Sequence, residues 1–113
     1  MVKGTRQYWE HNQVNLASTT TPVKICTLHK GESAWIKAHI ENTGYIYLGN
    51  DEHVSSSNGY LLEQGEGVEM KYDSGDDDIN YIEVWAIPAT ANDDIVFFRN
   101  IKIRPFKNKE WKP

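Results

Sequence analysis

The segment SAWIKAHIE, residues 33–41, alternates between two kinds of side chain. Small and aliphatic residues occupy its even positions, and aromatic, polar or charged residues occupy most of its odd positions. Successive side chains of a β-strand point to opposite faces, so this period of two predicts a strand with one buried face. We expect the buried face to carry Ala34, Ile36, Ala38 and Ile40. The opposite face then carries Trp35, Lys37, His39 and Glu41.

The same periodicity recurs along the chain in short segments separated by turn residues. These segments are VKICTLH (23–29), VEMKY (68–72), INYIEVWAIP (79–88) and DDIVFFRNIKIRP (93–105). The Asn-Thr-Gly sequence before YIYLG (45–49) predicts a hairpin return from the strand at 33–41, with positive φ at Gly44. Six or seven short strands of this kind predict an all-β chain. We expect a single small antiparallel β-sandwich, jelly-roll-like or barrel-like, with extended N- and C-terminal arms.

Two of these strands carry unusual residues on one face. In 93–105, the inward positions Ile95, Phe97, Ile101 and Ile103 are interrupted by Arg99. In 79–88, Ile82, Val84 and Ala86 share one face, while the other face carries Tyr81, Glu83, Trp85 and Ile87. A strand that is apolar on both faces is covered on both faces. In so small a chain, we expect the second cover to be another subunit.

The two ends of the chain depart from the strand pattern. We divide the sequence into an N-terminal arm (1–21), a β-sandwich domain (22–103) and a basic aromatic C-terminal tail (104–113). Large aromatic side chains on such segments bury much apolar area when they dock. We therefore expect a partner-binding role for Tyr8, Trp9, Phe106 and Trp111. The alternative is that both ends fold back along open edges of their own sheets.

Composition limits the class of protein. A chain of 113 residues suits one compact domain, and a net charge of −4 leaves no broad basic surface for phosphate, so we expect no nucleic-acid partner. The N-terminal residues lack the apolar core of a signal peptide, and no apolar run is long enough to span a bilayer. We expect no membrane partner and synthesis in the cytoplasm.

No motif in the sequence identifies a catalytic site or a metal site. Cys26 lies between apolar and small residues and is expected to be a buried hydrophobe, and the histidines are scattered singly. The acidic turn DSGDDD, residues 73–78, is expected to be solvated, with calcium binding as the alternative. Among 16 acids some carboxylates must lie close together, which leaves a hydrolytic acid pair as a weak alternative. We expect no enzymatic activity, no cofactor and no metal.

Four segments, in order, resemble a small β domain found in structural proteins of tailed-phage virions. They are an IxNTG turn at 40–44, an aromatic YIYLG strand at 45–49, an NG-aromatic-x-L segment at 58–66 that ends in GE, and a strand ending in an AI pair at 85–91. In this pattern Gly59 and Gly65 shape a connection that carries Tyr60 and Leu62 toward the core. The longer acidic turn and the aromatic arms depart from the pattern.

The resemblance implies a virion component without catalysis, located in the virion and made in the host cytoplasm. The expected function is decoration or cementing of the capsid exterior, as a homo-oligomer bound to the major capsid protein or another shell protein. One alternative is a carbohydrate-binding module that uses Trp35, Tyr45 or Tyr47 as an exposed aromatic strip. A weaker alternative is a neck or tail component of the same particle.

Overall fold

The computed structural model describes residues 6–72 and 81–103, and the side chains of residues 10–72 and 81–100. Within these residues the chain forms eight β-strands and no helix. The strands are β1 (Arg6–Leu16), β2 (Val23–His29), β3 (Glu32–Ala38), β4 (Ile46–Gly49), β5 (Tyr60–Leu62), β6 (Gly67–Tyr72), β7 (Tyr81–Pro88) and β8 (Asp93–Ile103). The predicted all-β class is confirmed.

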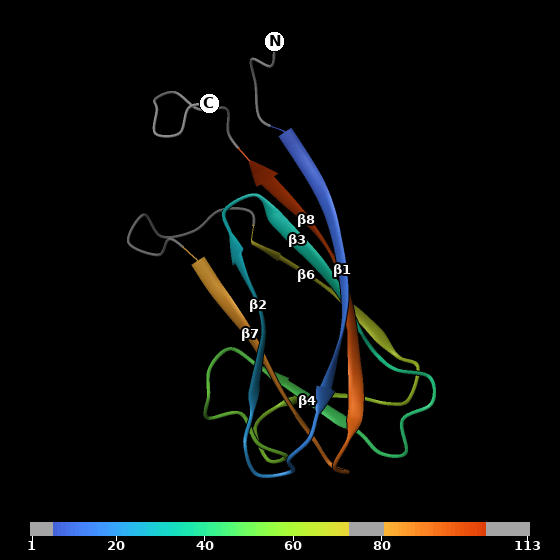
Figure 1. Ribbon diagram of the computed structural model, residues 1–113. Coiled ribbons are helices and arrows are strands. Elements are labelled where there is room, and N and C mark those ends of the chain that lie inside the picture. The colour runs from blue at the N-terminus through green and yellow to red at the C-terminus, as the bar shows by residue number, and fades with distance from the viewer. Residues whose placement is uncertain (1–5, 73–80, 104–113) are drawn as a thin grey trace.

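The strands form two antiparallel sheets that pack face to face, with the orders β1-β8-β3-β6 and β2-β7-β4-β5 (Figure 1). Strand β1 pairs with β8, β2 with β7, β3 with β6, and β4 with β5. Laid out flat, these four pairs would form one long antiparallel hairpin. Two further pairs complete the two sheets, namely β3 with β8 and β4 with β7. This is the strand order of a jelly roll. The expected small antiparallel sandwich is therefore confirmed.

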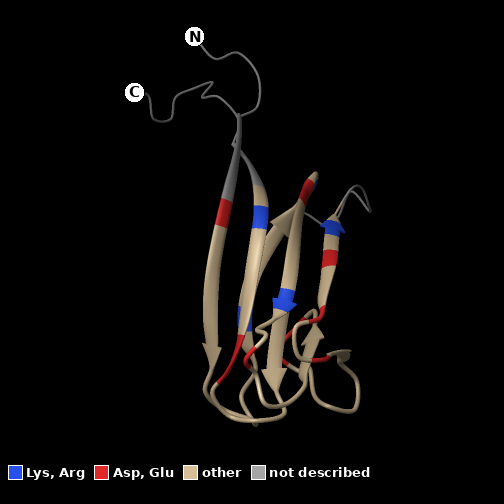
Figure 2. Ribbon diagram, turned by 90° about the vertical axis from the view of Figure 1, so that its right-hand side faces the viewer, with Lys and Arg blue, Asp and Glu red and all other residues tan. Residues whose placement is uncertain are grey.

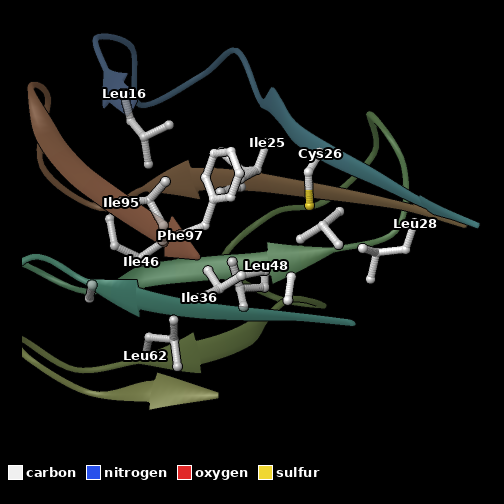
Figure 3. Close-up of a cluster of buried hydrophobic side chains, with 14 of the residues drawn as sticks. Leu16, Ile25, Cys26, Leu28, Ile36, Ile46, Leu48, Leu62, Ile95 and Phe97 are labelled. Atoms are coloured by element: carbon white, nitrogen blue, oxygen red, sulfur yellow. The ribbon is translucent and has the colours of Figure 1, made fainter. Parts of the chain in front are cut away.

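The space between the sheets is filled by aliphatic side chains from both layers (Figure 3). Ala34, Ile36 and Ala38 of β3 are fully buried there, as their alternation predicts, while Trp35 and Lys37 face solvent. The other fully buried large side chains are Leu16, Leu28, Ile46, Leu62, Val84 and Ile95. The core thus draws on β1, β2, β4, β5, β7 and β8 as well as on β3.

The prediction that Ile40 shares the buried face of β3 is wrong. Strand β3 ends at Ala38, and the Ile40 side chain is 61% exposed. The backbone of Ala38 pairs with the turn that follows β5, since its N–H donates to the carbonyl of Glu66 and its carbonyl accepts from Gly65. The chain leaves the sheet at this point, so the period of two no longer describes which side chains are buried.

The predicted hairpin between 33–41 and 45–49 is also wrong, because β3 and β4 lie in different sheets. The connection between them crosses from one layer to the other and is anchored on the start of β8. The buried carboxylate of Asp93 accepts from the backbone N–H groups of Thr43 and Gly44 at 2.8 to 3.1 Å. The buried Asn42 amide bonds both the N–H and the carbonyl of Asp94. These bonds satisfy the polar groups of the Asn-Thr-Gly turn.

Glycine serves two different purposes in these connections. Gly44 does not have positive φ, contrary to prediction. A Cβ at this position would lie 2.5 Å from Oγ1 of Thr90, so the turn requires close approach rather than an unusual backbone conformation. Gly65 does have positive φ, at 77°, which a residue with a side chain adopts at a cost. The prediction that Gly65 shapes the turn before β6 is confirmed.

Strand β5 places its two predicted core residues differently. Leu62 is fully buried, as expected, whereas Tyr60 is 60% exposed and the expectation for it is wrong. The two residues are an even number of positions apart, but β5 has only three residues and lies at an edge of its sheet. Because β5 is the last strand of its sheet, the Tyr60 side chain has no neighbouring strand on one side and remains exposed to solvent. Tyr60 there lines a shallow apolar cleft together with Val68 and Met70 of β6.

Residues 6–16, expected to be part of an arm, form β1 and pair with the whole length of β8 from Leu16↔Asp93 to Arg6↔Ile103. The sheet therefore begins well before residue 22. The side chains that attach this edge strand are mostly polar. Gln13 and Asn15 donate to the Asp94 carboxylate, and Glu10 pairs with Arg99 at 2.6 Å. An edge strand held by polar contacts has little apolar alternation, which is why its sequence does not resemble a strand.

Candidate functional site

Two of the four predicted partner-binding residues, Tyr8 and Trp9, lie in the described part of β1. The backbone of Tyr8 pairs with Ile101, and that of Trp9 pairs with Asn100. Their side chains lie outside the described residues, as do Phe106 and Trp111. For residues 6–16 the structure has the backbone arrangement of the alternative hypothesis, in which the N-terminal segment covers an edge of its own sheet. The docking role of the four aromatics remains a prediction.

Strands β1 and β8 extend beyond the rest of their sheet as a two-stranded ribbon. Strand β3 pairs with β8 only from Ser33↔Asn100 to Ala38↔Ile95. Residues 101–103 are thus paired with β1 but lie past the last partner in β3 (Figure 1). We call residues 6–9 with 100–103 the terminal ribbon. Trp9 and Asn100 form its base, where Asn100 still pairs with Ser33 of β3. It brings the two ends of the described chain together at one end of the sandwich.

The second candidate surface is the outer face of the β1-β8-β3-β6 sheet. Trp35 of β3 and Phe98 of β8 are direct cross-strand neighbours, 40% and 44% exposed. Their ring centroids are 6.2 Å apart at an interplanar angle of 45°, a tilted arrangement typical of aromatic pairs. Exposed aromatic pairs of this kind mark binding surfaces more often than isolated apolar residues do. We call this surface the aromatic face.

A shallow groove of about 370 Å³ runs along the aromatic face. It is lined by apolar residues of β3 and β8, among them Trp35, Val96 and Phe98, and by polar residues of β1 together with Lys37. His11 and Gln13 of β1 lie beside Phe98 and Val96 in the register of the sheet. The groove therefore combines an apolar floor with polar margins, an arrangement shared by ligand grooves and protein interfaces.

The three aromatics proposed as a sugar-binding strip do not form one. Trp35 lies on the outer face of one sheet, whereas Tyr47 lies in β4 of the other sheet. Tyr47 is half-buried. Gly59 lies close to it and to Val54, since a Cβ at Gly59 would be 2.7 Å from Cβ of Tyr47 and 3.0 Å from Cγ2 of Val54. Tyr45 precedes β4 and is 47% exposed. Trp35 has Phe98 of β8 as its aromatic neighbour instead, a residue absent from the predicted strip.

The second face of β7 is covered along only part of its length. Ile87 is buried next to Tyr47, Trp85 is half-buried, and Tyr81 is 50% exposed. The indole N–H of Trp85 donates to the carboxylate of Glu83 at 2.8 Å. Part of the expected cover thus comes from the chain itself. Cover of the Tyr81 end by another subunit remains a prediction.

A polar cluster inside the sandwich holds the sheets together near the terminal ribbon. The Arg99 guanidinium donates to the carbonyl of Thr27 in the opposite sheet and to the Glu10 carboxylate, both at 2.6 Å. The buried Cys26 lies close to this group. Burial raises the pKa of the Cys26 thiol to about 11, against the opposing effect of Arg99. A protonated, buried thiol is a poor nucleophile, so this cluster is suited to structure rather than to covalent catalysis.

The buried carboxylates are already engaged in structural contacts. Asp93 holds the turn at residues 43–44, and Glu32 accepts from the backbone N–H of His29 at 2.9 Å. Among residues 6–72 and 81–103, no group of three or more His, Cys, Asp or Glu side chains is arranged to hold a metal ion. The acidic turn at 73–78 lies outside the described residues. No helix in the described part of the chain is long and apolar enough to cross a membrane.

Comparison with known proteins identifies no relative: no family model, no curated protein and no solved structure matches this chain.

Proposed function

We propose that this chain is a non-enzymatic structural protein of a tailed-phage virion that decorates or cements the capsid exterior. It docks on the shell through the terminal ribbon and the segment that follows it. The major capsid protein is the proposed partner. The proposal joins a sequence resemblance with one feature of the fold, the terminal ribbon.

The terminal ribbon is the observation that carries the proposal. The terminal ribbon brings the backbones of Tyr8 and Trp9 to the same end of the molecule as Ile103. Phe106 and Trp111 follow Ile103 in the sequence. Aromatic residues are enriched at the centres of protein interfaces, where they supply most of the binding energy. A binding site confined to one end of the molecule would let the protein attach to the shell with the other end exposed.

The distribution of charge also distinguishes the two ends of the molecule. Most of the described acidic residues in loops lie in the half of the sandwich away from the terminal ribbon (Figure 2). The acidic residues in the described loops are Glu41, Asp51, Glu52, Glu63 and Glu66, and all five are exposed. An acidic outer end favours solubility and discourages association between particles. The C-terminal tail, in contrast, carries Arg104, Lys107, Lys109 and Lys112.

The segments that carry the virion resemblance occupy positions on which this fold depends. The Asn-Thr-Gly turn forms the crossing between sheets that Asn42 and Asp93 anchor, and Gly65 supplies the positive φ before β6. Jelly-roll sandwiches occur in viral capsid proteins and also in lectins, so the fold alone favours neither function. The resemblance and the terminal ribbon together favour the virion.

Binding to purified empty capsids tests the proposal. The full chain should co-sediment with capsids, and the double variant Trp9→Ala with Trp111→Ala should lose this binding while it remains folded by circular dichroism. Tyr60→Ala is the matched control, because it removes an exposed aromatic from the opposite edge of the sandwich. Equal binding by the double variant and the intact chain would refute docking through this end.

A carbohydrate-binding module is the second candidate, and the groove beside Trp35 and Phe98 is the observation that favours it. Planar aromatic surfaces bind the apolar faces of pyranose rings, and polar margins can bond their hydroxyl groups. A glycan array separates the two candidates. Saturable binding that Trp35→Ala abolishes, without any binding to capsids, would favour the module. A neck or tail position remains the weaker form of the virion proposal.

A further inference from the structure

We infer that the aromatic face is the contact between two copies of this chain, which pack face to face about a two-fold axis parallel to the strands. The inference goes beyond the proposed function and is independent of it, because the aromatic face is not part of the terminal ribbon. It rests on the cross-strand register of four strands, on exposure and on the order of charges across the sheet.

One row of residues crosses the whole sheet on its outer face. In register, His11 of β1 lies beside Phe98 of β8, Phe98 lies beside Trp35 of β3, and Trp35 lies beside Glu69 of β6. His11 and Glu69 are both exposed, at opposite edges of the row. From β1 to β6 the row therefore contains a hydrogen-bond donor, two aromatic rings and a carboxylate acceptor. If a second row faces the first in the opposite order, each donor meets an acceptor and each ring meets a ring.

A two-fold axis that runs between β8 and β3, parallel to them, superposes this row on its reverse. Each Trp35 then packs on Phe98 of the second copy, and each His11 lies opposite Glu69 of the second copy. Imidazole donates a hydrogen bond to a carboxylate when neutral and carries the opposite charge when protonated. Every contact of an isologous interface is made twice, so the pair gains two aromatic contacts and two polar contacts.

The neighbouring row agrees with the same axis. Lys37 lies beside Val96 in register, so the rotation places the aliphatic stem of each Lys37 over Val96 of the second copy. The next residues, His39 and Asp94, are joined by a backbone hydrogen bond of 3.1 Å, but β3 ends at Ala38 and they are not counted in the face. No described acid on these rows is brought against another acid.

An axis perpendicular to the strands gives a poorer match. It would place Glu69 against Glu69 of the second copy, and two carboxylates opposite each other are unfavourable. His11 would lie opposite His11 and would lose its carboxylate acceptor. Charge complementarity therefore selects the parallel axis. A second copy places a donor opposite an acceptor at both edges of the row at once, which the order His11, Phe98, Trp35, Glu69 matches.

The size of the aromatic face sets the expected strength. Four strands spaced about 4.8 Å apart, each contributing roughly seven residues at about 3.3 Å, form a face of about 19 by 23 Å. This lies at the small end of specific protein interfaces. We expect a reversible dimer with a dissociation constant in the micromolar range rather than the nanomolar range.

Sedimentation velocity of the full chain, from about 1 to 500 μM at pH 6 and low salt, tests the inference. The intact chain should shift from monomer to dimer across this range. Trp35→Ala should weaken the dimer by roughly thirtyfold or more, because it removes a central aromatic contact from both halves of the interface. Glu52→Lys is the control for charge, since Glu52 is exposed in the β4–β5 connection, and it should leave the dimer unchanged.

A charge exchange makes the test specific to the proposed axis. His11→Glu and Glu69→Lys should each weaken the dimer by about tenfold, and the double variant should recover to within about threefold of the intact chain. Within one copy the two residues are three strands apart, about 14 Å, so rescue cannot come from a new contact inside the monomer. A double variant as weak as the single variants would overturn the inference.

Three other results would also overturn it. One is a chain that stays monomeric at every concentration. If Trp35→Ala also abolishes binding of that monomer to a glycan array, the aromatic face is a saccharide site instead. Another is a dimer that Trp35→Ala leaves intact. The last is a dimer that depends on Trp9 and Trp111 but not on Trp35, which would assign self-association to the terminal ribbon. Capsid binding can succeed or fail separately from each of these results.

Discussion

Truncation of two isoleucines to alanine, Ile36→Ala and Ile40→Ala, should have very different costs in stability. The two residues are four positions apart and fall on the same side of the alternating segment 33–41. Ile36 is fully buried between the sheets, whereas Ile40 is 61% exposed after the end of β3. A fully buried isoleucine costs about 2 to 5 kcal/mol on truncation to alanine. Ile40 retains most of its contact with water, so we expect a cost below about 1 kcal/mol.

Urea unfolding followed by tryptophan fluorescence measures this difference. Both variants should show a two-state transition with the slope m of the intact chain, so that the midpoints report stability directly. For a chain of this size, a loss of about 3 kcal/mol lowers the melting temperature by on the order of 10 °C. We expect a shift of that size for Ile36→Ala and a few degrees at most for Ile40→Ala.

Equal costs for the two variants would refute this assignment of the core. A large cost at Ile40 would mean that β3 continues past Ala38 with its alternation intact. In that case the crossing between the sheets, which Asn42 and Asp93 anchor, would have to start later in the chain. A small cost at both positions would mean that the face carrying Ala34, Ile36 and Ala38 is not the face between the sheets.

Three further outcomes follow from the same structure. Asp93→Ala should cost about 2 to 3 kcal/mol in urea unfolding, because it leaves the N–H groups of Thr43 and Gly44 without their buried acceptor. Gly65→Ala should cost about 1 to 3 kcal/mol, since it forces a side chain into positive φ and toward Ile40, with Gly67→Ala as a control at ordinary φ. The Cys26 thiol should resist alkylation in the folded chain. Because its folded pKa is raised from 9.0 to about 11, the stability that it contributes should be complete below pH 9 and fall as the pH rises toward 11, relative to Cys26→Ala.

The strands with a clear period of two could be predicted from the sequence. Ala34, Ile36 and Ala38 in β3 and Val84 and Ala86 in β7 are buried, and Glu69 and Lys71 in β6 are exposed, as their alternation indicates. Alternation reports which side of a strand is buried, because the hydrophobic effect acts on each side chain separately. It stops being informative where a strand ends, which explains the error at Ile40.

The pairing of strands cannot be predicted from alternation. In a jelly roll the partners of β1, β2 and β3 lie far away in the sequence, and no local signal specifies them. The sequence does not indicate β1 as a strand, because its described residues attach to β8 through polar contacts such as that of Gln13 with Asp94. In β2 a shift of register between Lys24 and Cys26 leaves the adjacent Ile25 and Cys26 both buried, which a strict period of two forbids.

The candidate surfaces likewise combine features that alternation predicts with features that depend on strand pairing. The exposure of Trp35 could be predicted from its own strand, but its neighbour Phe98 could be identified only after β3 and β8 were paired. The alternation in DDIVFFRN does place Phe98 on the side opposite Ile95 and Phe97, and that signal was present in the sequence. The terminal ribbon depends wholly on the pairing of β1 with β8.

The number of copies of this chain in an intact virus particle tests the proposed function most directly. Quantitative mass spectrometry of purified particles measures that number against the major capsid protein. A protein that decorates the capsid exterior should be present at on the order of hundreds of copies per particle, in a fixed ratio to the shell protein, as the symmetry of the shell requires. About a dozen copies or fewer would assign the chain to the neck or tail, and its absence from purified particles would contradict a virion role altogether.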